Sequence, residues 1–362
     1  MCSVLLLLVL ALAGVSACSD SDGPGPRVAR PAPVGEERTV QLGFGALPAA
    51  RSRDAYIDAF ATAARYGEAI VIQRAPPWAD FLPGGRISTE TQAETRLETD
   101  LLDQYSRLTR FYAIDPTDPG VRRARLADPP AGAAAEEGFT NPDVRRAFIN
   151  YTAYVTKNYR PDYLALGVEI NMLYERSPDQ FAAFVTLYEE AYAVAKAASP
   201  RTKVFPTFQL EDLLGRLDMV HQPHWEVLDF FRGKMDAFAV TTFPYFGAVR
   251  STEELDPAYY SQLRQHFEGE ILIAQAGYPS LPVESRAVIG TEPDQEAFVA
   301  RLLDDAEGAS YSFVLWIAAR DPSFAQTGSS AVVRDTGLRK SDGSNKLAWT
   351  TWEAWALRPV KP

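Results

Sequence analysis

A glutamate stands directly after an apolar, strand-like run, Tyr163 to Val168, where an ionisable side chain is unusual. Burying an ionised carboxylate is costly unless it is paired, so Glu169 needs a reason to be there. Glu169 and Asn171 are two residues apart, which puts both side chains on one side of an extended chain. An apolar wall would favour the protonated form of such a carboxyl group, as a general acid requires. A structural glutamate paired with an arginine of a neighbouring strand is the alternative.

Two further apolar runs end in residues that could act on a substrate. Ile271 to Ala274 leads into Gln275, and a Gly-Tyr-Pro-Ser segment that contains Tyr278 follows closely. The run 312–317 carries Trp316 near its end. In a parallel barrel the carboxyl ends of the strands share one face, so these residues are expected near Glu169.

The elements that would position these residues form a regular alternation. Eight β-rich apolar runs alternate with helical patterns, which is typical of a parallel α/β fold. The predicted strands are 39–44, 68–73, 109–114, 163–168, 203–208, 237–242, 270–274 and 312–317. The predicted helices are 54–66, 90–108, 143–159, 178–198, 257–267, 292–305 and 347–355. Eight such units predict a single (β/α)8 TIM barrel over residues 38–362. The fifth strand is weakened by Pro206.

A doubly wound open sheet is the competing fold. That fold usually carries a glycine-rich phosphate turn after its first strand, but Gly43-Phe44-Gly45 is followed by Ala-Leu-Pro and lacks the third glycine. The sequence therefore favours the barrel and predicts no nucleotide cofactor. The largest insertion, 115–138, follows the third strand and would lie on the catalytic face.

These motifs together resemble the clan A retaining glycoside hydrolases, and most closely their arabinogalactan endo-galactanase and endo-glucanase branches. The resemblance rests on Glu169, on a polar residue at 275 before Gly-aromatic-Pro, on Trp316 and on the closing segment 336–346. It implies that Glu169 is the acid/base, that residue 275 occupies the nucleophile position and that Trp316 is a sugar platform.

The same resemblance suggests which residues would line a substrate groove. Residues 241–245 would lie beside the nucleophile position, which brings Tyr245 close to it. Asn171 and Tyr278 would face the substrate from their strand ends. Trp78, in a Pro-Pro-Trp segment after the second strand, is either a sugar-stacking aromatic or a loop anchor.

Three positions depart from the family pattern. Val168 stands where an asparagine is commonest, and Phe243 stands where a tyrosine often contacts the nucleophile. Gln275 is the most serious departure, because a retaining glycosidase needs a second carboxylate about 5 Å from the acid. An amide keeps the shape and the hydrogen bonds of a carboxylate but is neutral and a very poor nucleophile. It cannot stabilise an oxocarbenium charge as a carboxylate does.

Several functions stay open at this point. A different carboxylate, Asp115, Glu211 or Asp321, or a group of the substrate itself, could replace the nucleophile of a β-glycan hydrolase. The chain could instead be a catalytically silent protein that binds poly- or oligosaccharides. A structural envelope lipoprotein is the third alternative.

Composition excludes other classes of function. The formal net charge of −11 argues against nucleic acid, whose phosphates need a basic surface. His221 and His224 are separated by Gln-Pro, and the sequence offers no evident third ligand, so no metal site is predicted. Neither a phosphate-binding loop nor a Gly-x-Ser-x-Gly elbow is present.

The first residues form a targeting segment. The apolar run 4–14 is too short to span a bilayer, and it leads into Val-Ser-Ala-Cys18, which resembles a bacterial lipobox. The resemblance implies a signal peptide over residues 1–17, acylation of Cys18 and a flexible tether over residues 18–37. Membrane contact would be through this lipid alone, at the outer membrane in a cell that has one. Ordinary secretion after Ala17 is the alternative.

Overall fold

The computed structural model describes most of the predicted barrel. The described residues are 28–130, 132–217, 221–247, 249–283, 290–325 and 333–361. The predicted signal peptide and Cys18 lie outside them. Within these ranges no helix has the length and apolar character that crossing a bilayer requires.

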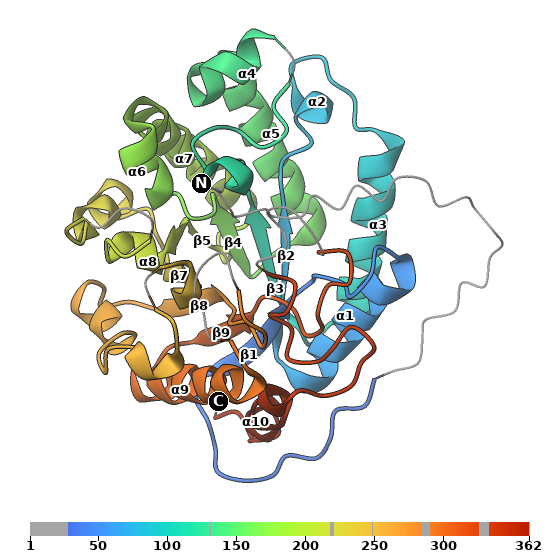
Figure 1. Cartoon of the computed structure of the whole chain (residues 1–362). Helices are drawn as coiled ribbons and strands as arrows, with labels where there is room; N and C mark the ends of the chain where they lie inside the picture. Colours follow the sequence, from blue (N-terminus) through green and yellow to red (C-terminus); the bar gives the residue numbers. More distant parts are fainter. Residues whose placement is uncertain are drawn as a thin grey trace, which may run out of the picture.

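Parallel strands form a barrel at the centre of the molecule (Figure 1). The strands are β1 Gln41–Gly45, β2 Ala69–Arg74, β3 Thr109–Ile114, β4 Tyr163–Leu166, β5 Lys203–Phe205, β6 Thr207–Gln209, β7 Phe238–Thr242, β8 Ile271–Ala276 and β9 Phe313–Trp316. Their order is β5-β4-β3-β2-β1-β9-β8-β7-β6. β5 pairs with β4 and β6 pairs with β7, so the two halves of one interrupted strand close the barrel. The interruption is Pro206, which has no N–H to donate. The predicted barrel of eight strands is confirmed.

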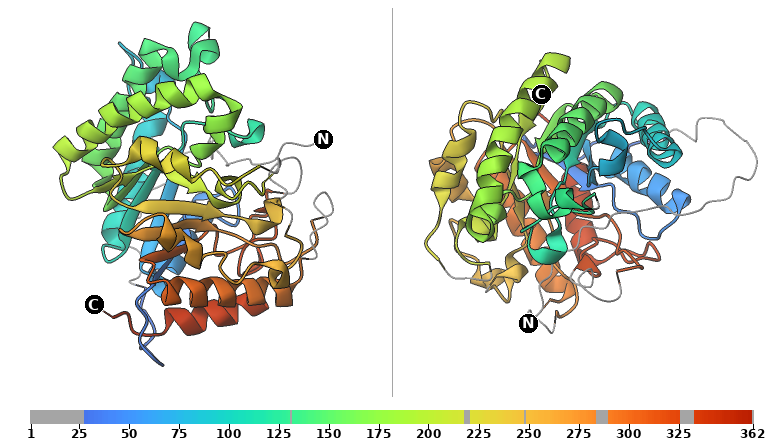
Figure 2. Two further views of the ribbon diagram at one scale, coloured as in Figure 1. Left: turned by 90° about the vertical axis from the view of Figure 1, so that its left-hand side faces the viewer. Right: turned by 90° about the horizontal axis from the view of Figure 1, so that it is seen from above.

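Helices surround the strands (Figure 2). The long ones are α1 Arg53–Tyr66, α3 Thr89–Gln104, α5 Pro142–Tyr159, α7 Pro178–Ala198, α9 Glu292–Gly308 and α10 Leu347–Ala356. The short ones are α2 Trp78–Phe81, α4 Ala133–Glu137, α6 Asn171–Arg176 and α8 Leu210–Leu213. The prediction of a helix over 257–267 is wrong. That segment forms turns and a 3-10 helix, Ser261–Gln265, beside the buried neighbours Tyr259 and Tyr260.

Strand alternation divides the apolar side chains into two layers. Phe313 and Leu315 belong to a small cluster inside the barrel, together with Val71, Phe111 and Leu272. The alternate residues of each strand join the larger core between the barrel and the helices. Successive side chains on a strand point to opposite faces, so each strand contributes to both layers.

The last part of the predicted tether is bound to the barrel. The Val34 N–H donates to the Leu357 carbonyl at 2.7 Å, and Arg30 forms an ion pair with Glu68, directly before β2. These contacts lie at the amino ends of the strands, beside α10 (Figure 1). The chain therefore leaves the barrel at the end opposite the carboxyl ends of the strands.

Candidate active site

Glu169 is held in a sharp turn after β4. Gly167 has a φ of +97° and Glu169 a φ of +52°, both in the left-handed region that non-glycine residues rarely adopt. The Glu169 N–H donates to the hydroxyl of Thr207 at 3.0 Å, which fixes the turn against β6. Such strained residues persist only where the surroundings determine them, and they concentrate at functional sites.

The Glu169 carboxylate is fully engaged and 1% exposed. One oxygen accepts from the Thr241 hydroxyl at 2.7 Å, and the other pairs with Nε of Arg123 at 2.6 Å. Arg123 comes from the insertion after β3 and is itself fully buried. Glu169 is therefore paired with an arginine, as the alternative interpretation of the sequence expected. The arginine, however, lies on a loop and not on a neighbouring strand.

Arg123 also binds Asp115, at the end of β3. Its Nη1 lies 2.5 Å from Asp115 Oδ1, and the Gln73 amide donates to the other oxygen at 2.9 Å. Burial raises the pKa of Asp115 to about 6, although the Arg123 charge and the Gln73 hydrogen bond lower it. We call Asp115, Arg123 and Glu169 the bridged triad, because one guanidinium joins two carboxylates.

Gln275 lies on the same inner rim. It is opposite Thr241 in the register between β8 and β7, and a β-bulge precedes this pair. Paired residues on adjacent strands present their side chains to one face, so Gln275 and Thr241 face the barrel mouth together. Since the Thr241 hydroxyl contacts Glu169, the two predicted catalytic positions are brought to one site. The Gln275 side chain remains partly exposed.

Two of the proposed replacement carboxylates serve other contacts. Glu211 accepts from Thr242, Tyr259 and the Phe243 N–H at 2.7, 2.8 and 3.0 Å. Burial raises the pKa of Glu211, and these hydrogen bonds oppose the shift. Asp321 pairs with Lys346 at 2.7 Å in the C-terminal segment.

Asp321 and Lys346 also line a cavity of about 340 Å³. Burial raises the pKa of Asp321 to about 6, although the charge of Lys346 lowers it. Of the three candidates, Asp115 alone contacts the arginine that binds Glu169.

The predicted sugar platforms do not face the mouth. Trp316 is fully buried, packs against Phe298 and Trp352, and donates from Nε1 to the Thr336 carbonyl at 2.8 Å. The prediction fails because Leu315 points into the barrel, so its neighbour must point toward the helices. Tyr278 is fully buried as well and stacks on Phe298 at 4.8 Å.

Three other predicted contact residues are also buried. Tyr245 is fully buried against Phe246, and Trp78 is 2% exposed and donates to the Ala127 carbonyl at 2.7 Å. Trp78 thus anchors its loop, and it also lines a cavity beside β2. Asn171 binds the backbone of Gln209 through both ends of its amide. It does not share a direction with Glu169, because the chain turns into α6 between them.

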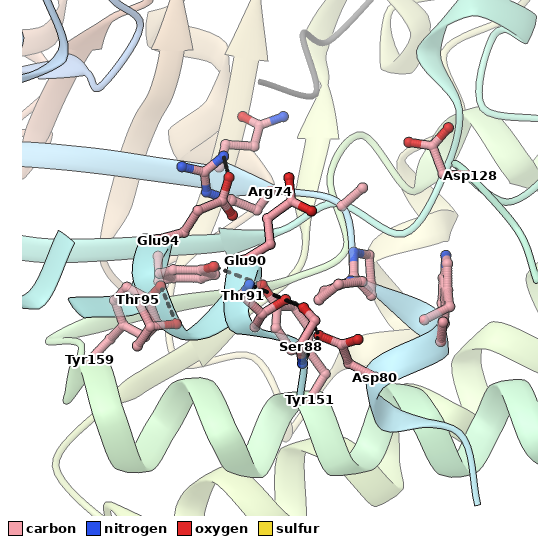
Figure 3. Close-up of a pocket in the computed structure, with 17 residues that line it drawn as sticks. Arg74, Asp80, Ser88, Glu90, Thr91, Glu94, Thr95, Asp128, Tyr151 and Tyr159 are labelled. Carbon is pink, nitrogen blue, oxygen red and sulfur yellow. Dashed lines mark hydrogen bonds and ion pairs between the residues drawn. The ribbon is translucent and has the colours of Figure 1, made fainter. Parts of the chain in front are cut away.

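A cavity of about 420 Å³ opens beside the end of β2 (Figure 3). On one wall Glu94 of α3 forms an ion pair with Arg74 at 4.0 Å, with Glu90 nearby, and Tyr151 and Tyr159 of α5 form another wall. Gln73 lines this cavity and also donates to Asp115, so the cavity adjoins the bridged triad.

Sequence reasoning missed Arg123, whose partner Glu169 lies 46 residues away along the chain. It also missed a third group beside the two histidines. Glu175 of α6 approaches both His221 and His224, so the premise that no third metal-ligating group exists does not hold. No local pattern indicates either pairing, since each joins two segments that are far apart along the chain.

The comparisons with known proteins agree with this fold. No protein-family model matches the chain, and no curated protein sequence matches it. A GH5_18 variant from Bifidobacterium longum subsp. longum in complex with Manβ1-4GlcNAc has a TM-score of 0.65 at 13% identity, over 89% of this chain and 80% of that one. The exo-β-1,4-mannosidase Op5Man5 from Opitutaceae bacterium strain TAV5 has a TM-score of 0.64 at 14% identity, over 93% and 62%.

The Ignisphaera aggregans GH53 catalytic domain has a TM-score of 0.55 at 15% identity, over 92% of this chain and 99% of that one. All three are similar in fold and distant in sequence. The chain therefore has the (β/α)8 fold of the clan A glycoside hydrolases, and the resemblance stated from its sequence is confirmed at the level of the fold.

Proposed function

We propose that this protein binds β-linked oligosaccharides at the barrel mouth and does not hydrolyse them by the retaining mechanism. The observation that carries the proposal is the bridged triad. Arg123 donates to one carboxylate oxygen of Glu169 and Thr241 to the other, and Glu169 is 1% exposed.

The retaining mechanism needs two groups that the expected positions, Glu169 and Gln275, do not supply. One is a carboxyl group that donates a proton, and the other is a carboxylate nucleophile about 5 Å away. Glu169 is tied to a guanidinium at 2.6 Å, and position 275 carries a neutral amide. An amide binds hydroxyl groups as donor and acceptor, which suits sugar recognition without chemistry.

Two features support binding of a sugar. The Gln275 side chain is partly exposed on the inner rim. The cavity beside β2 falls in the size range of small-molecule sites, and the carboxylates that line it, those of Asp80, Glu90 and Glu94 among them, are groups that pair with sugar hydroxyls. The fold neighbours include an exo-β-1,4-mannosidase and a complex with Manβ1-4GlcNAc, so β-1,4-linked manno-oligosaccharides are the first ligands to test.

Hydrolysis is tested with aryl β-mannosides, β-glucosides and β-galactosides and with β-1,4-linked oligosaccharides. We expect wild type to release no more product than Glu169→Gln. If wild type hydrolyses a substrate and Glu169→Gln does not, the proposal that the protein is catalytically inactive is overturned. If Asp115→Asn also abolished it, Asp115 would be the second carboxylate.

Binding is tested by titration calorimetry with the same oligosaccharides. We expect saturable binding that Gln275→Leu weakens about tenfold, because an apolar side chain cannot pair with hydroxyl groups. Gln262→Leu, on the 3-10 helix after β7, serves as the matched control and should leave the affinity unchanged. Absence of binding across the panel would leave the structural-lipoprotein alternative.

We further propose that the chain is an exported lipoprotein acylated at Cys18. The lipobox-like segment supports this assignment. Attachment at the amino ends of the strands would turn the mouth away from the membrane. Metabolic labelling with an alkyne fatty acid should mark wild type and Cys2→Ser but not Cys18→Ser. Equal labelling of all three proteins, or none, would contradict it.

A further inference from the structure

The loops after β4 and β6 bring three metal-ligating groups together on the catalytic face. Glu175 lies on α6, which follows the Glu169 turn, and His221 and His224 follow α8. One ligand atom from each of the three residues lies within 4.8 Å of the others. α6 and α8 are neighbours in the fold (Figure 1). This cluster is separate from the bridged triad and shares no residue with it.

The distances fit a shared cation better than direct hydrogen bonds. Glu175 Oε1 lies 3.3 Å from His224 Nδ1, and Glu175 Oε2 lies 3.4 Å from His221 Nε2. Both exceed the usual N–H···O range of about 2.7–3.2 Å. Ligands on a tetrahedral ion with bonds of about 2.0–2.1 Å stand about 3.3–3.4 Å apart, and each imidazole lies at that distance from a different oxygen of the Glu175 carboxylate. Glu175 Oε2 is buried and has no hydrogen-bond partner within the described residues.

The second nitrogen of each imidazole faces an oxygen atom, at hydrogen-bond distance in His221 and at a longer distance in His224. His221 Nδ1 lies 2.7 Å from the Gln222 carbonyl, so it carries the proton and leaves Nε2 as a free lone pair. His224 Nε2 lies 3.4 Å from Asp212 Oδ2, which leaves Nδ1 directed at Glu175. Metal-binding histidines almost always have such a carbonyl or carboxylate on the second nitrogen, because it fixes the tautomer and the ring.

The backbone holds both histidines in place. The His224 N–H donates to the Leu213 carbonyl at 3.1 Å, and the His221 N–H donates to the Gly215 carbonyl at 3.3 Å. Asp212, behind His224, also binds Arg176 at 2.9 Å. The site is thus preorganised by groups outside it, which lowers the cost of metal binding.

We propose that Glu175, His221 and His224 bind one divalent metal ion, with Zn²⁺ preferred. Two imidazole nitrogens and one carboxylate suit Zn²⁺, and a fourth position stays available for water. Magnesium and calcium prefer ligand sets made of oxygen alone. Because the ion would join α6 to the segment after α8, its role is to fix this wall of the barrel mouth.

The test uses the full-length chain without a polyhistidine tag, stripped of metal by a chelator that is then removed. Titration with ZnCl₂ in the calorimeter should give one equivalent bound, and Co²⁺ should produce the visible absorption of a tetrahedral site. His221→Gln, His224→Gln and Glu175→Gln should each weaken Zn²⁺ binding at least about tenfold. Zn²⁺ should raise the Tm of wild type by about 3 °C or more and that of these variants by less.

Two variants serve as controls. His266→Gln removes the third histidine of the chain, which stacks on Trp225 outside the cluster. Glu226→Gln removes an exposed carboxylate near His224. Both should bind Zn²⁺ like wild type, and circular dichroism checks that every variant is folded. The proposal is overturned if wild type binds no stoichiometric Zn²⁺, or if the double variant His221→Gln/His224→Gln binds it unchanged. The cluster would then be a set of plain ion pairs.

Discussion

At the scale of single residues, the charge arrangement around Glu169 decides what the mouth can do. Two carboxylates and one guanidinium lie together with at most 3% of any residue exposed. Desolvation of such charges is costly, and their mutual attraction offsets the cost only while all partners are present. Loss of any one member of the bridged triad is therefore expected to lower the stability of the fold.

Replacing Arg123 by methionine should destabilise the fold by about 3–5 kcal/mol, because two buried carboxylates lose their shared cation. Urea denaturation measures this change in the free energy of unfolding. Arg125→Met is the control, since the Arg125 side chain is 66% exposed and lies 3.7 Å from Asp118. Its effect should stay within about 0.5 kcal/mol. Equal changes in the free energy of unfolding for the two variants would show that the bridged triad does not stabilise the fold more than a surface ion pair does.

The Asp115 carboxyl group should give the stability a defined pH dependence. Its pKa rises from 3.8 to about 6 on folding, mainly through burial, so the folded state binds a proton that the unfolded state has lost. The stabilising contribution is therefore complete below pH 3.8 and is lost as the pH rises through about 6.

Asp115→Asn removes this contribution. The free energy of unfolding of the variant, relative to wild type, should increase between pH 4 and pH 7 by up to about 3 kcal/mol. Denaturant titrations at several pH values measure the difference. Asp100→Asn, an exposed position on α3, should show no such trend. A difference for Asp115→Asn that does not vary with pH would contradict the assignment.

At the scale of elements, the turn between β4 and α6 sets the direction of Glu169. Gly167 has a φ of +97°, and a Cβ built there would lie 2.6 Å from the Phe184 ring on α7. The backbone therefore needs glycine for its conformation and for its contact with the helix layer. A change at this turn displaces Glu169 from Arg123 and Thr241.

Gly167→Ala should lower the free energy of unfolding by about 2 kcal/mol or more, because it combines left-handed backbone strain with a steric clash. Gly308→Ala, near the end of α9, has open space around its Cβ and should change it by less than about 1 kcal/mol. Thermal and urea unfolding of both variants make the comparison. A neutral Gly167→Ala would mean that the turn can relax without cost.

At the scale of the whole molecule, the segment before β1 and the end of α10 meet at the amino ends of the strands. Arg38 is fully buried and reaches the Trp355 carbonyl at 2.9 Å, the Val40 carbonyl at 2.5 Å and Glu68 at 2.8 Å. It thus joins the segment before β1 to β2 and to α10. These contacts lie at the end of the barrel opposite the mouth.

Arg38→Met should cost about 3–5 kcal/mol of stability, since it leaves Glu68 and two carbonyls without their buried donor. The variant should also expose the first described residues to limited proteolysis. Arg51→Met, on the exposed segment before α1, is the control and should change neither property. Unchanged proteolysis of Arg38→Met would show that other contacts hold this segment.

The sequence by itself determined the barrel and the location of the site. Each strand is a local apolar run between helical patterns, so its position follows from short-range periodicity. Glu169 and Gln275 were placed at the mouth because both follow such runs, and carboxyl ends share one face. Pro206 was identified as a weak point for a local reason as well, the missing N–H.

The tertiary structure alone decided what surrounds these residues. The direction of Trp316 depends on which face of β9 looks inward, and a short apolar run with both faces buried does not reveal it. Arg123 reaches Glu169 across 46 residues, and His224 reaches Glu175 across 49. Such pairs depend on how loops fold over the barrel. Many long-range contacts fix those paths together, and spacing along the chain does not encode them.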